Sequence, residues 1–344
     1  MTDTPGIELD AVTDWLREHV DGATPPFSFS LVAAGGSNLT YRVVDTSGRA
    51  VALRRPPVAA VLATAHDMDR EWRILDALHH NTTVPVPAPL AQCTDVDVTG
   101  APFYVMDFVE GPILRTKAEA EVSFGEADRK AIGERVVDTL VAIHAVDPDE
   151  AGVGDLGRKE DYVARQLRRW HGQWEKSKTR ELEVIDDVHR RLSERIPEQG
   201  PATIVHGDYR LDNLILSADG EIAAVVDWEL CTLGDPLADV GMLLVYWSQP
   251  GDELMPLFDP PTTAAGFPLR ADVRERYAEL SGRDLAEIDY YVALAFWKLA
   301  IILEGVFARY AAGQYGKDEE GYQQFAKVVE RLAEGADQAE RRLR

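Results

Sequence analysis

The sequence predicts an α+β fold with two parts, a strand-rich first third and a mainly helical remainder. Short apolar runs, separated by turns that contain glycine or proline, fill the chain up to Gly111, and long segments with helical periodicity follow. Strands first and helices afterwards are typical of α+β folds and of two-lobed chains, and 344 residues are comfortable for two lobes. We therefore expect one lobe at residues 1–107, a hinge at 108–111 and a second lobe at 112–344.

The first lobe is predicted to open with an amphipathic helix at residues 7–20, because Val12, Trp15 and Leu16 recur near helical spacing. Strands on both sides of a glycine turn, three further strands and one helix should follow. The strands are expected within residues 28–45, 49–55 and 84–111, and the helix at 65–80.

The second lobe should consist of long helices, expected at residues 124–144, 159–176, 181–195, 271–280, 284–312 and 321–341. One apolar stretch, residues 290–310, is long enough to cross a membrane. Lys298, Glu304 and Arg309 interrupt it, which favours a buried helix over a membrane span.

The composition and the N-terminal sequence disfavour nucleic-acid and membrane partners. The net charge of −23 disfavours nucleic acid, whose affinity depends on contacts between cations and phosphates. Cys93 and Cys231 give neither a disulfide framework nor metal-ligand spacing, which fits a reducing compartment. The polar, acidic N-terminus shows no signal peptide, so a cytoplasmic protein without a membrane partner is expected. The oligomeric state is not predicted.

The stretch VHGDYRLDNLIL, residues 205–216, carries the strongest functional signal. Two apolar runs flank Asp219-Gly220, which predicts a β-hairpin whose ends bring Asn213 close to Asp227. An amide oxygen and a carboxylate at one place suit Mg²⁺, and Asp208 can face the same spot from the preceding loop. Taken one at a time these are ordinary loop residues; their combination with the hairpin points to a site.

These residues resemble the kinase-like phosphotransferases, the aminoglycoside and choline kinase group, and more narrowly the branch also found fused to some acyl-CoA dehydrogenases. His206-Gly207-Asp208…Asn213 resembles the catalytic loop, and Asp227-Trp228-Glu229 resembles the metal-binding segment. The resemblance covers nearly the whole chain. It implies a two-lobed, protein-kinase-like fold in which Asp208 is the catalytic base and Asn213 and Asp227 hold Mg²⁺ on the phosphates of ATP.

The same resemblance assigns the nucleotide-binding residues of the first lobe. Arg54 stands where the kinase third strand carries a lysine, with Arg55 as an alternative that strand alternation would point the other way. Glu71 resembles the helix glutamate that pairs with this cation. The alternatives are a surface arginine and a solvated helix face.

Two segments without strong side-chain signals complete the nucleotide site implied by the resemblance. Gly35-Gly36-Ser37-Asn38 occupies the glycine-loop position, where Gly36, Ser37 and Asn38 would approach phosphate. VMDFVEG resembles the hinge, where the carbonyl of Asp107 and the N–H of Val109 would bond adenine. A plain turn and a simple connector are the alternatives.

Departures from the protein-kinase pattern favour a small-molecule acceptor. Gly207 replaces the arginine that reads a phosphorylated activation loop, and Asp227 is too close to Asp239 for a peptide-docking segment. Asp239 resembles the helix acid that braces the catalytic loop. Glu229 and Asp235 are expected to support the structure, as is His144, a core histidine.

The acceptor itself is not specified by the motifs. Residues 161–180 are basic and aromatic in an acidic chain, with Tyr162, Gln166 and Trp170 on one helical face and Arg165, Arg168 and Arg169 beside it. Such a patch would suit a hydroxy acid or a hydroxyacyl-CoA better than an aminoglycoside, or it is an ordinary packed helix.

Two other functions are open at this point. One is a catalytically idle nucleotide-binding module. The other is a hydrolytic metal site at His206, Asp208 and Asp227, which would need a further His or carboxylate cluster that the sequence does not show at suitable spacing. The preference for ATP over GTP and a role in antibiotic resistance are not predicted.

Overall fold

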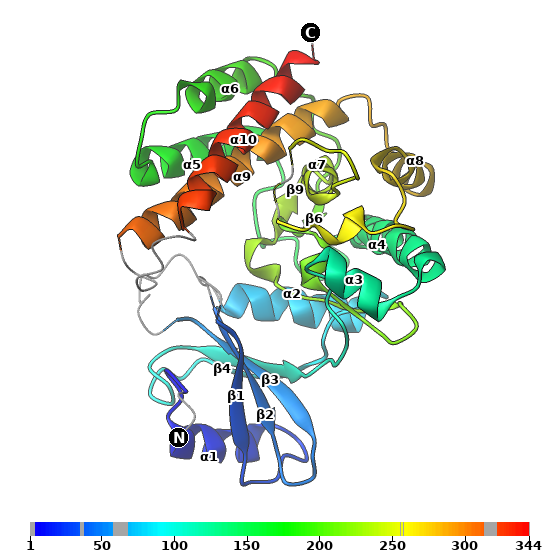
Figure 1. Ribbon diagram of the computed structural model, residues 1–344. Helices are drawn as coiled ribbons and strands as arrows, with labels where there is room; N and C mark the ends of the chain where they lie inside the picture. The colour runs from blue at the N-terminus through cyan, green and yellow to red at the C-terminus, as the bar shows by residue number, and fades with distance from the viewer. Residues whose placement is uncertain are drawn as a thin grey trace. The chain divides into compact units, whose positions relative to one another are not determined.

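The computed structural model describes residues 4–34, 38–57, 68–254, 256, 258–312 and 322–343 (Figure 1). The chain divides into two compact units. Unit 1 comprises residues 1–111, 151–153 and 223–229, and unit 2 comprises residues 112–150, 154–222 and 230–344. Residues 112–344, expected as one second lobe, are divided between the two units, and the expected lobe boundaries stay a prediction. The segment 223–229 groups with unit 1, where the Val225 N–H donates to the Pro85 carbonyl over 2.8 Å.

Unit 1 is built on one antiparallel sheet of five strands in the order β1-β2-β3-β5-β4. Helix α1 (Leu9–His19) precedes the sheet, and α2 (Met68–Asn81) follows β3 in the chain. The strands are β1 (Ser28–Ala34), β2 (Leu39–Val44), β3 (Ala50–Arg55), β4 (Pro89–Cys93) and β5 (Phe103–Asp107). All of these elements were expected from the sequence.

The side chains of β3 point alternately to the two faces of the sheet, so its neighbouring residues have different surroundings. Val51 and Leu53 belong to the core that also contains the buried face of α1. Arg55 points the same way, is 3% exposed, and donates to the carbonyls of Pro56 and Thr99. Arg54 is thereby directed to the other face, as alternation predicted.

Unit 2 is mainly helical. Its helices are α3 (Lys117–Ser123), α4 (Glu126–Ala145), α5 (Tyr162–Ser177), α6 (Glu183–Glu194), α7 (Leu237–Tyr246), α8 (Arg270–Ser281), α9 (Ile288–Ala311) and α10 (Tyr322–Arg341). Strand β6 (Thr203–Val205) pairs with β9 (Thr232–Gly234) in antiparallel fashion. The sequence prediction missed α3, α7 and this short strand pair. Helix α7 is buried almost all round, so it shows no amphipathic stripe.

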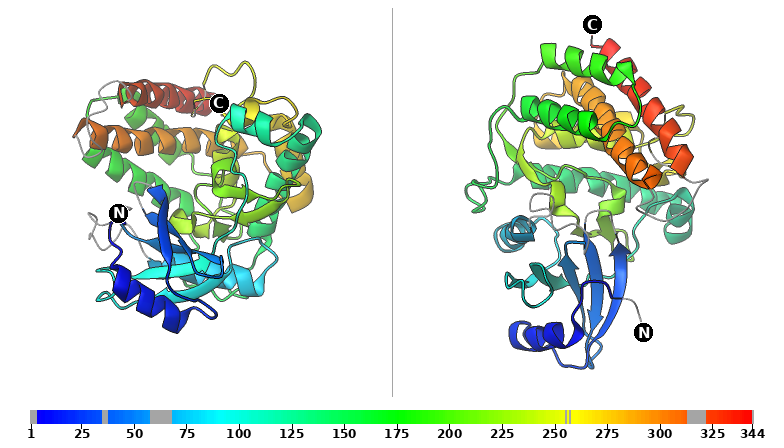
Figure 2. Two further views of the ribbon diagram at one scale, coloured as in Figure 1. Left: turned by 60° about the horizontal axis from the view of Figure 1, so that its bottom comes forward. Right: turned by 90° about the vertical axis from the view of Figure 1, so that its left-hand side faces the viewer.

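Helix α9 runs alongside α10 in both figures and also contacts α7 and α5 (Figures 1 and 2). Among the described residues, it is the one helix long and apolar enough to cross a membrane, and 56% of its most apolar window is buried within the protein. The predicted buried helix is confirmed. A helix that is apolar on all sides is expected where neighbouring helices enclose it.

The predicted β-hairpin is present. Strands β7 (Leu214–Leu216) and β8 (Ile222–Val225) form a two-stranded sheet. The turn is closed by the Ser217 N–H, which donates to the Glu221 carbonyl over 2.9 Å. Gly220 has a φ of +76°, a conformation that glycine adopts at little cost, which explains the Asp-Gly signal.

Candidate active site

The loop after β6 is fixed by a carboxylate from helix α7. Asp239 accepts the backbone N–H groups of His206, over 2.6 Å, and Gly207, over 2.8 Å. Its side chain is 1% exposed and also lies 3.3 Å from Nε2 of His144. The sequence-based expectation that Asp239 braces this loop is confirmed, and His144 is the satisfied core histidine that was expected, since its Nδ1 also lies 2.8 Å from the Tyr277 hydroxyl.

The surroundings of Asp239 favour its ionised form despite its burial. Burial would raise the pKa of this carboxyl, but the hydrogen bond and charge of His144, the charge of His206 and the Gly207 N–H together hold the pKa below its usual value. A buried carboxylate with these partners fixes the backbone direction at the start of the loop.

Gly207 is required by the backbone at this point. Its φ is +87°, and a Cβ there would lie 2.7 Å from the carbonyl oxygen of Leu230 and 2.9 Å from the Leu230 Cβ. The departure from the protein-kinase pattern therefore has a local reason, because no larger residue fits at this position without moving Leu230 or the loop.

Asp208 and Asn213 lie together in unit 2. The Asn213 amide donates to the main-chain carbonyl of Asp208 over 2.8 Å and to its Oδ2 over 3.2 Å, from a 3₁₀ turn at Leu211–Asn213. The Asp208 side chain is 25% exposed, and Arg210 Nε lies 3.4 Å from its Oδ2. The predicted base thus reaches solvent, while the predicted metal ligand beside it fixes its orientation.

A second cluster of charges lies within unit 1. Arg54 Nε is 2.8 Å from Glu71 Oε2, and Arg54 Nη2 contacts Asp227 and lies 3.7 Å from Glu229. Glu71 also accepts from the Tyr104 hydroxyl over 2.9 Å. The predicted pairing of Arg54 with Glu71 is therefore present.

The charges in this cluster depend on one another. Burial would lower the pKa of Arg54, but Glu71, Tyr104, Asp227 and Glu229 raise it above its usual value, so the guanidinium stays charged. Burial raises the pKa of Glu71, and Arg54 opposes that shift. The buried ion pair of Arg54 and Glu71 is stable because several hydrogen bonds compensate for the removal of both charges from water.

The predicted metal ligands are placed in different units. Asn213 belongs to unit 2, whereas Asp227 belongs to unit 1, where its side chain is 32% exposed beside Arg54. An amide oxygen and an accessible carboxylate are donor groups that suit Mg²⁺. That they hold one ion together remains a prediction.

The other predicted nucleotide contacts are mostly main-chain groups. Gly36 and Ser37, with Gly35, lie outside the described residues. Asn38 is buried and donates from its amide to Glu71 over 2.8 Å and to Glu229 over 3.3 Å, so its side chain supports the cluster around Arg54. Asp107 ends β5, and Val109 follows it in a half-buried position.

Sequence reasoning missed one residue next to the catalytic loop. Lys298, on α9, donates from Nζ to the Gly207 carbonyl over 2.9 Å. In the sequence, Lys298 only interrupts an apolar stretch. The available signal was a lysine flanked on both sides by apolar residues in a helix, because a charge in that position needs a partner.

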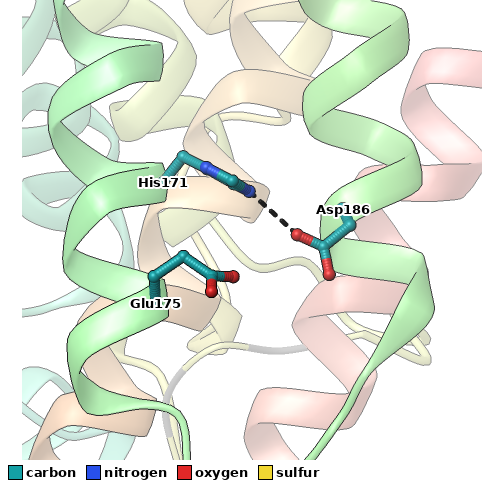
Figure 3. A group of neighbouring side chains, drawn as sticks. All are labelled: His171, Glu175 and Asp186. Carbon is teal, nitrogen blue, oxygen red and sulfur yellow. Dashed lines mark hydrogen bonds and ion pairs between the residues drawn. The ribbon is translucent and has the colours of Figure 1, made fainter.

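The structure also brings together a His and carboxylate cluster that the sequence analysis did not find. Figure 3 shows His171 and Glu175 on α5 near Asp186 on α6, with their ligand atoms all within 4.8 Å of one another. His171 Nε2 lies 2.9 Å from Asp186 Oδ1, which links the two helices. The cluster contains none of the residues of the hydrolytic site considered above.

Comparisons with known proteins agree with this geometry. The model of the phosphotransferase enzyme family matches residues 28–291. Mouse acyl-CoA dehydrogenase family member 10 is 33% identical over 338 residues, which cover 96% of this chain and 31% of the mouse protein. This chain therefore spans about a third of that relative.

Two solved structures share the fold. The crystal structure of a putative aminoglycoside phosphotransferase from Ralstonia eutropha JMP134 is 31% identical with a TM-score of 0.81, covering 97% of this chain and 98% of that one. A thermostable mutant of the aminoglycoside phosphotransferase APH(4)-Ia, solved with AMP-PNP and hygromycin B, has a TM-score of 0.61 at 18% identity, covering 95% of this chain and 98% of that one.

The chain belongs to the phosphotransferase enzyme family. Its fold is the predicted one, α+β and two-lobed in the manner of protein kinases, with an N-terminal antiparallel sheet plus helix and a larger, mainly helical C-terminal lobe.

Proposed function

We propose that this protein is a Mg-ATP-dependent kinase that transfers the γ-phosphoryl group to a hydroxyl of a small molecule. The observation that carries the proposal is the pairing of Asp208 with Asn213 on a loop that the buried Asp239 holds in place. Phosphoryl transfer needs positioned groups more than covalent chemistry, and this loop supplies a fixed, accessible carboxylate.

In the proposed reaction, Asp208 accepts the proton of the acceptor hydroxyl as its oxygen bonds to the γ-phosphorus. The bond from that phosphorus to the oxygen it shares with the β-phosphate breaks, and ADP leaves. Asn213 and Asp227 would hold Mg²⁺, which neutralises phosphate charge when bound.

Arg54 would bind phosphate oxygens in this scheme. Its guanidinium is planar and forked, so it can face two oxygens at once while Nε keeps its hydrogen bond to Glu71. Asp227 and Glu229 both contact Nη2 of Arg54, so a bound phosphate would compete with them for this nitrogen and a bound metal would compete with Arg54 for the carboxylates.

The acceptor we favour is anionic, a hydroxy acid or a hydroxyacyl-CoA. The support is the basic side of α5, where Arg168 and Arg169 are exposed in a chain of net charge −23. The name of the mouse relative, an acyl-CoA dehydrogenase family member, fits an acyl-CoA compound. An aminoglycoside is the second candidate, since the Ralstonia protein is described as a putative aminoglycoside phosphotransferase.

The test is transfer of phosphate from γ-labelled ATP into pooled hydroxy acids, hydroxyacyl-CoAs, sugars, amino alcohols and aminoglycosides, with mass analysis of the products. We expect a labelled product with the wild type and none with Asp208→Asn, which should still bind Mg-ATP. Asp187→Asn, an exposed carboxylate on α6, is the control and should behave as wild type.

Two results would contradict the proposal. Equal turnover by Asp208→Asn and wild type would remove Asp208 from its role. Mg-ATP that raises the melting temperature while no pool is labelled would favour the idle nucleotide-binding module, because a ligand stabilises the state that binds it whether or not it reacts.

A further inference from the structure

Lys298 lies between the catalytic loop and helix α5 within unit 2. Its ammonium donates to the Gly207 carbonyl over 2.9 Å and lies 5.4 Å from the centre of the Trp170 ring. The residue is half-buried on a helix whose neighbouring side chains are apolar. A lysine in such surroundings usually pairs with a carboxylate, yet here it faces a neutral carbonyl and an aromatic ring.

A second cation shares the same ring. The guanidinium carbon of Arg169 lies 5.3 Å from the centre of Trp170. The charge of Arg169 also reaches Lys298 and disfavours its protonated form, so an anion within reach of both cations would reduce their mutual repulsion. Trp170 itself is held in place, because its Nε1 donates to Gln166 over 2.9 Å.

The nearby carboxylates already have partners. Asp208 accepts from Asn213 and faces Arg210, and Asp239 accepts two backbone N–H groups of the loop. Burial lowers the pKa of Lys298, Asp208 and Asp239 act to raise it, and Arg169 lowers it further. A bound anion would oppose the effects of burial and of Arg169 and favour the charged form of Lys298.

We propose that Lys298 and Arg169, which both lie over the ring of Trp170, bind a carboxylate or phosphate group of the acceptor. This inference rests on the proposed function and makes it more specific: the acceptor carries an anionic group close to the hydroxyl that Asp208 faces. Lys298 would use its remaining N–H groups for the anion while one N–H stays on the Gly207 carbonyl.

The competing interpretation is that Lys298 only holds the catalytic loop through the Gly207 carbonyl. The two interpretations differ in what a charge-preserving substitution does. An arginine at position 298 keeps the positive charge for an anion, whereas the length and shape of its side chain disturb a single fitted hydrogen bond.

The first experiment measures binding without catalysis. Inorganic phosphate is titrated calorimetrically into the full chain at constant ionic strength, in the presence of saturating Mg-AMP-PNP so that the phosphate-binding part of the nucleotide site is filled. We expect Lys298→Met and Arg169→Gln each to weaken phosphate binding about tenfold or more, and Lys298→Arg to retain it. Arg190→Gln, an exposed arginine on α6, should bind as wild type.

Unchanged phosphate binding in Lys298→Met would overturn the subsite, and so would the absence of binding in the wild type. Failure of the proposed function is recognised separately, as the absence of any labelled product from γ-labelled ATP in the pools. The two failures therefore cannot be confused.

The second experiment uses an acceptor found in the labelled pools. Lys298→Met should raise KM for an anionic acceptor about tenfold or more and change kcat much less, because the lost contact is made in the bound state before transfer. With the wild type, KM should rise at alkaline pH, as Lys298 loses its proton below the pH usual for lysine.

The Lys298→Arg variant should lack this alkaline rise, since arginine stays charged. A loop-holding role would instead lower kcat in both variants and leave the pH dependence of KM unchanged. That pattern would overturn the proposal.

Discussion

Arg54 Nε lies 2.8 Å from Glu71 Oε2, and the two side chains are only 12% and 3% exposed. Removing one partner of a buried ion pair leaves a charge without compensation. In Glu71→Gln, Arg54 would keep Asp227 and Glu229, so we expect a loss of about 2 kcal/mol in the free energy of unfolding. Denaturant titration measures this, with Glu18→Gln as an exposed control that should change stability little.

The same variant should also bind Mg-ATP more weakly, because Arg54 would no longer be held in one direction. Arg54→Lys introduces the residue that is usual at this position in protein kinases. An ammonium lacks the fork that reaches Glu71 and Asp227 together, so we expect reduced but measurable nucleotide binding. Full nucleotide affinity in both variants would show that Arg54 does not contact phosphate.

Gly207→Ala should be more harmful than an alanine at another glycine with positive φ. Any such substitution costs roughly 1 kcal/mol for the backbone conformation, and at Gly207 the new Cβ would also meet the Leu230 carbonyl at 2.7 Å. We expect a further loss of about 1–3 kcal/mol and a large fall in kcat.

Gly251→Ala is the matched control, since Gly251 has a φ of +92° with nothing within 4 Å of the added Cβ. Equal losses of stability in Gly207→Ala and Gly251→Ala would mean that the loop moves aside at no cost.

The lowered pKa of Asp239 predicts how the free energy of unfolding depends on pH. Its pKa is lowered in the folded protein, so the ionised form stabilises the fold above the unfolded-state pKa, and this contribution disappears as the pH falls through the folded value. Free energies of unfolding should therefore decrease from about pH 4 downward. The decrease should be smaller in Asp239→Asn, which is already less stable at pH 7.

Measurement of unfolding by denaturant at half-unit pH steps checks this prediction, with Asp187→Asn as the exposed control. If the free energies of unfolding of wild type and Asp239→Asn changed in parallel with pH, protonation of Asp239 would not be the cause of the loss of stability in acid.

Removal of divalent cations should abolish transfer without unfolding the protein. Asp227 pairs with Arg54, so its carboxylate keeps a partner when a chelator removes a bound cation. We expect EDTA to stop labelling and to leave the melting temperature unchanged, while Mg-ATP raises it. A large fall in melting temperature with EDTA would instead indicate a structural metal.

The sequence predicted the elements that have a clear period or a strong turn signal. The strands of unit 1 and the β7–β8 hairpin around Asp219-Gly220 fall in this group, whereas the Arg54–Glu71 pair was implied by the family resemblance. Helix α7 was missed because burial on every side removes the apolar and polar stripes on which helix prediction depends.

The role of Lys298 was also beyond sequence reasoning. Its partners, Gly207 and Trp170, come from a loop and a helix far away in the chain, and no local pattern reports such a contact. Sequence reasoning missed the cluster of His171 with Asp186 for the same reason, because its members lie on two different helices.

Asp227 has a φ of +69°, a conformation that costs an ordinary residue roughly 1 kcal/mol and glycine almost nothing. One nucleotide change converts an aspartate codon into a glycine codon. Such a change would remove the carboxylate and relieve the backbone, while Arg54 kept Glu71 and Glu229. Lineages released from selection for phosphate transfer could therefore lose chemistry at this residue without first losing the fold, and inactive descendants should carry glycine or asparagine there more often than glutamate.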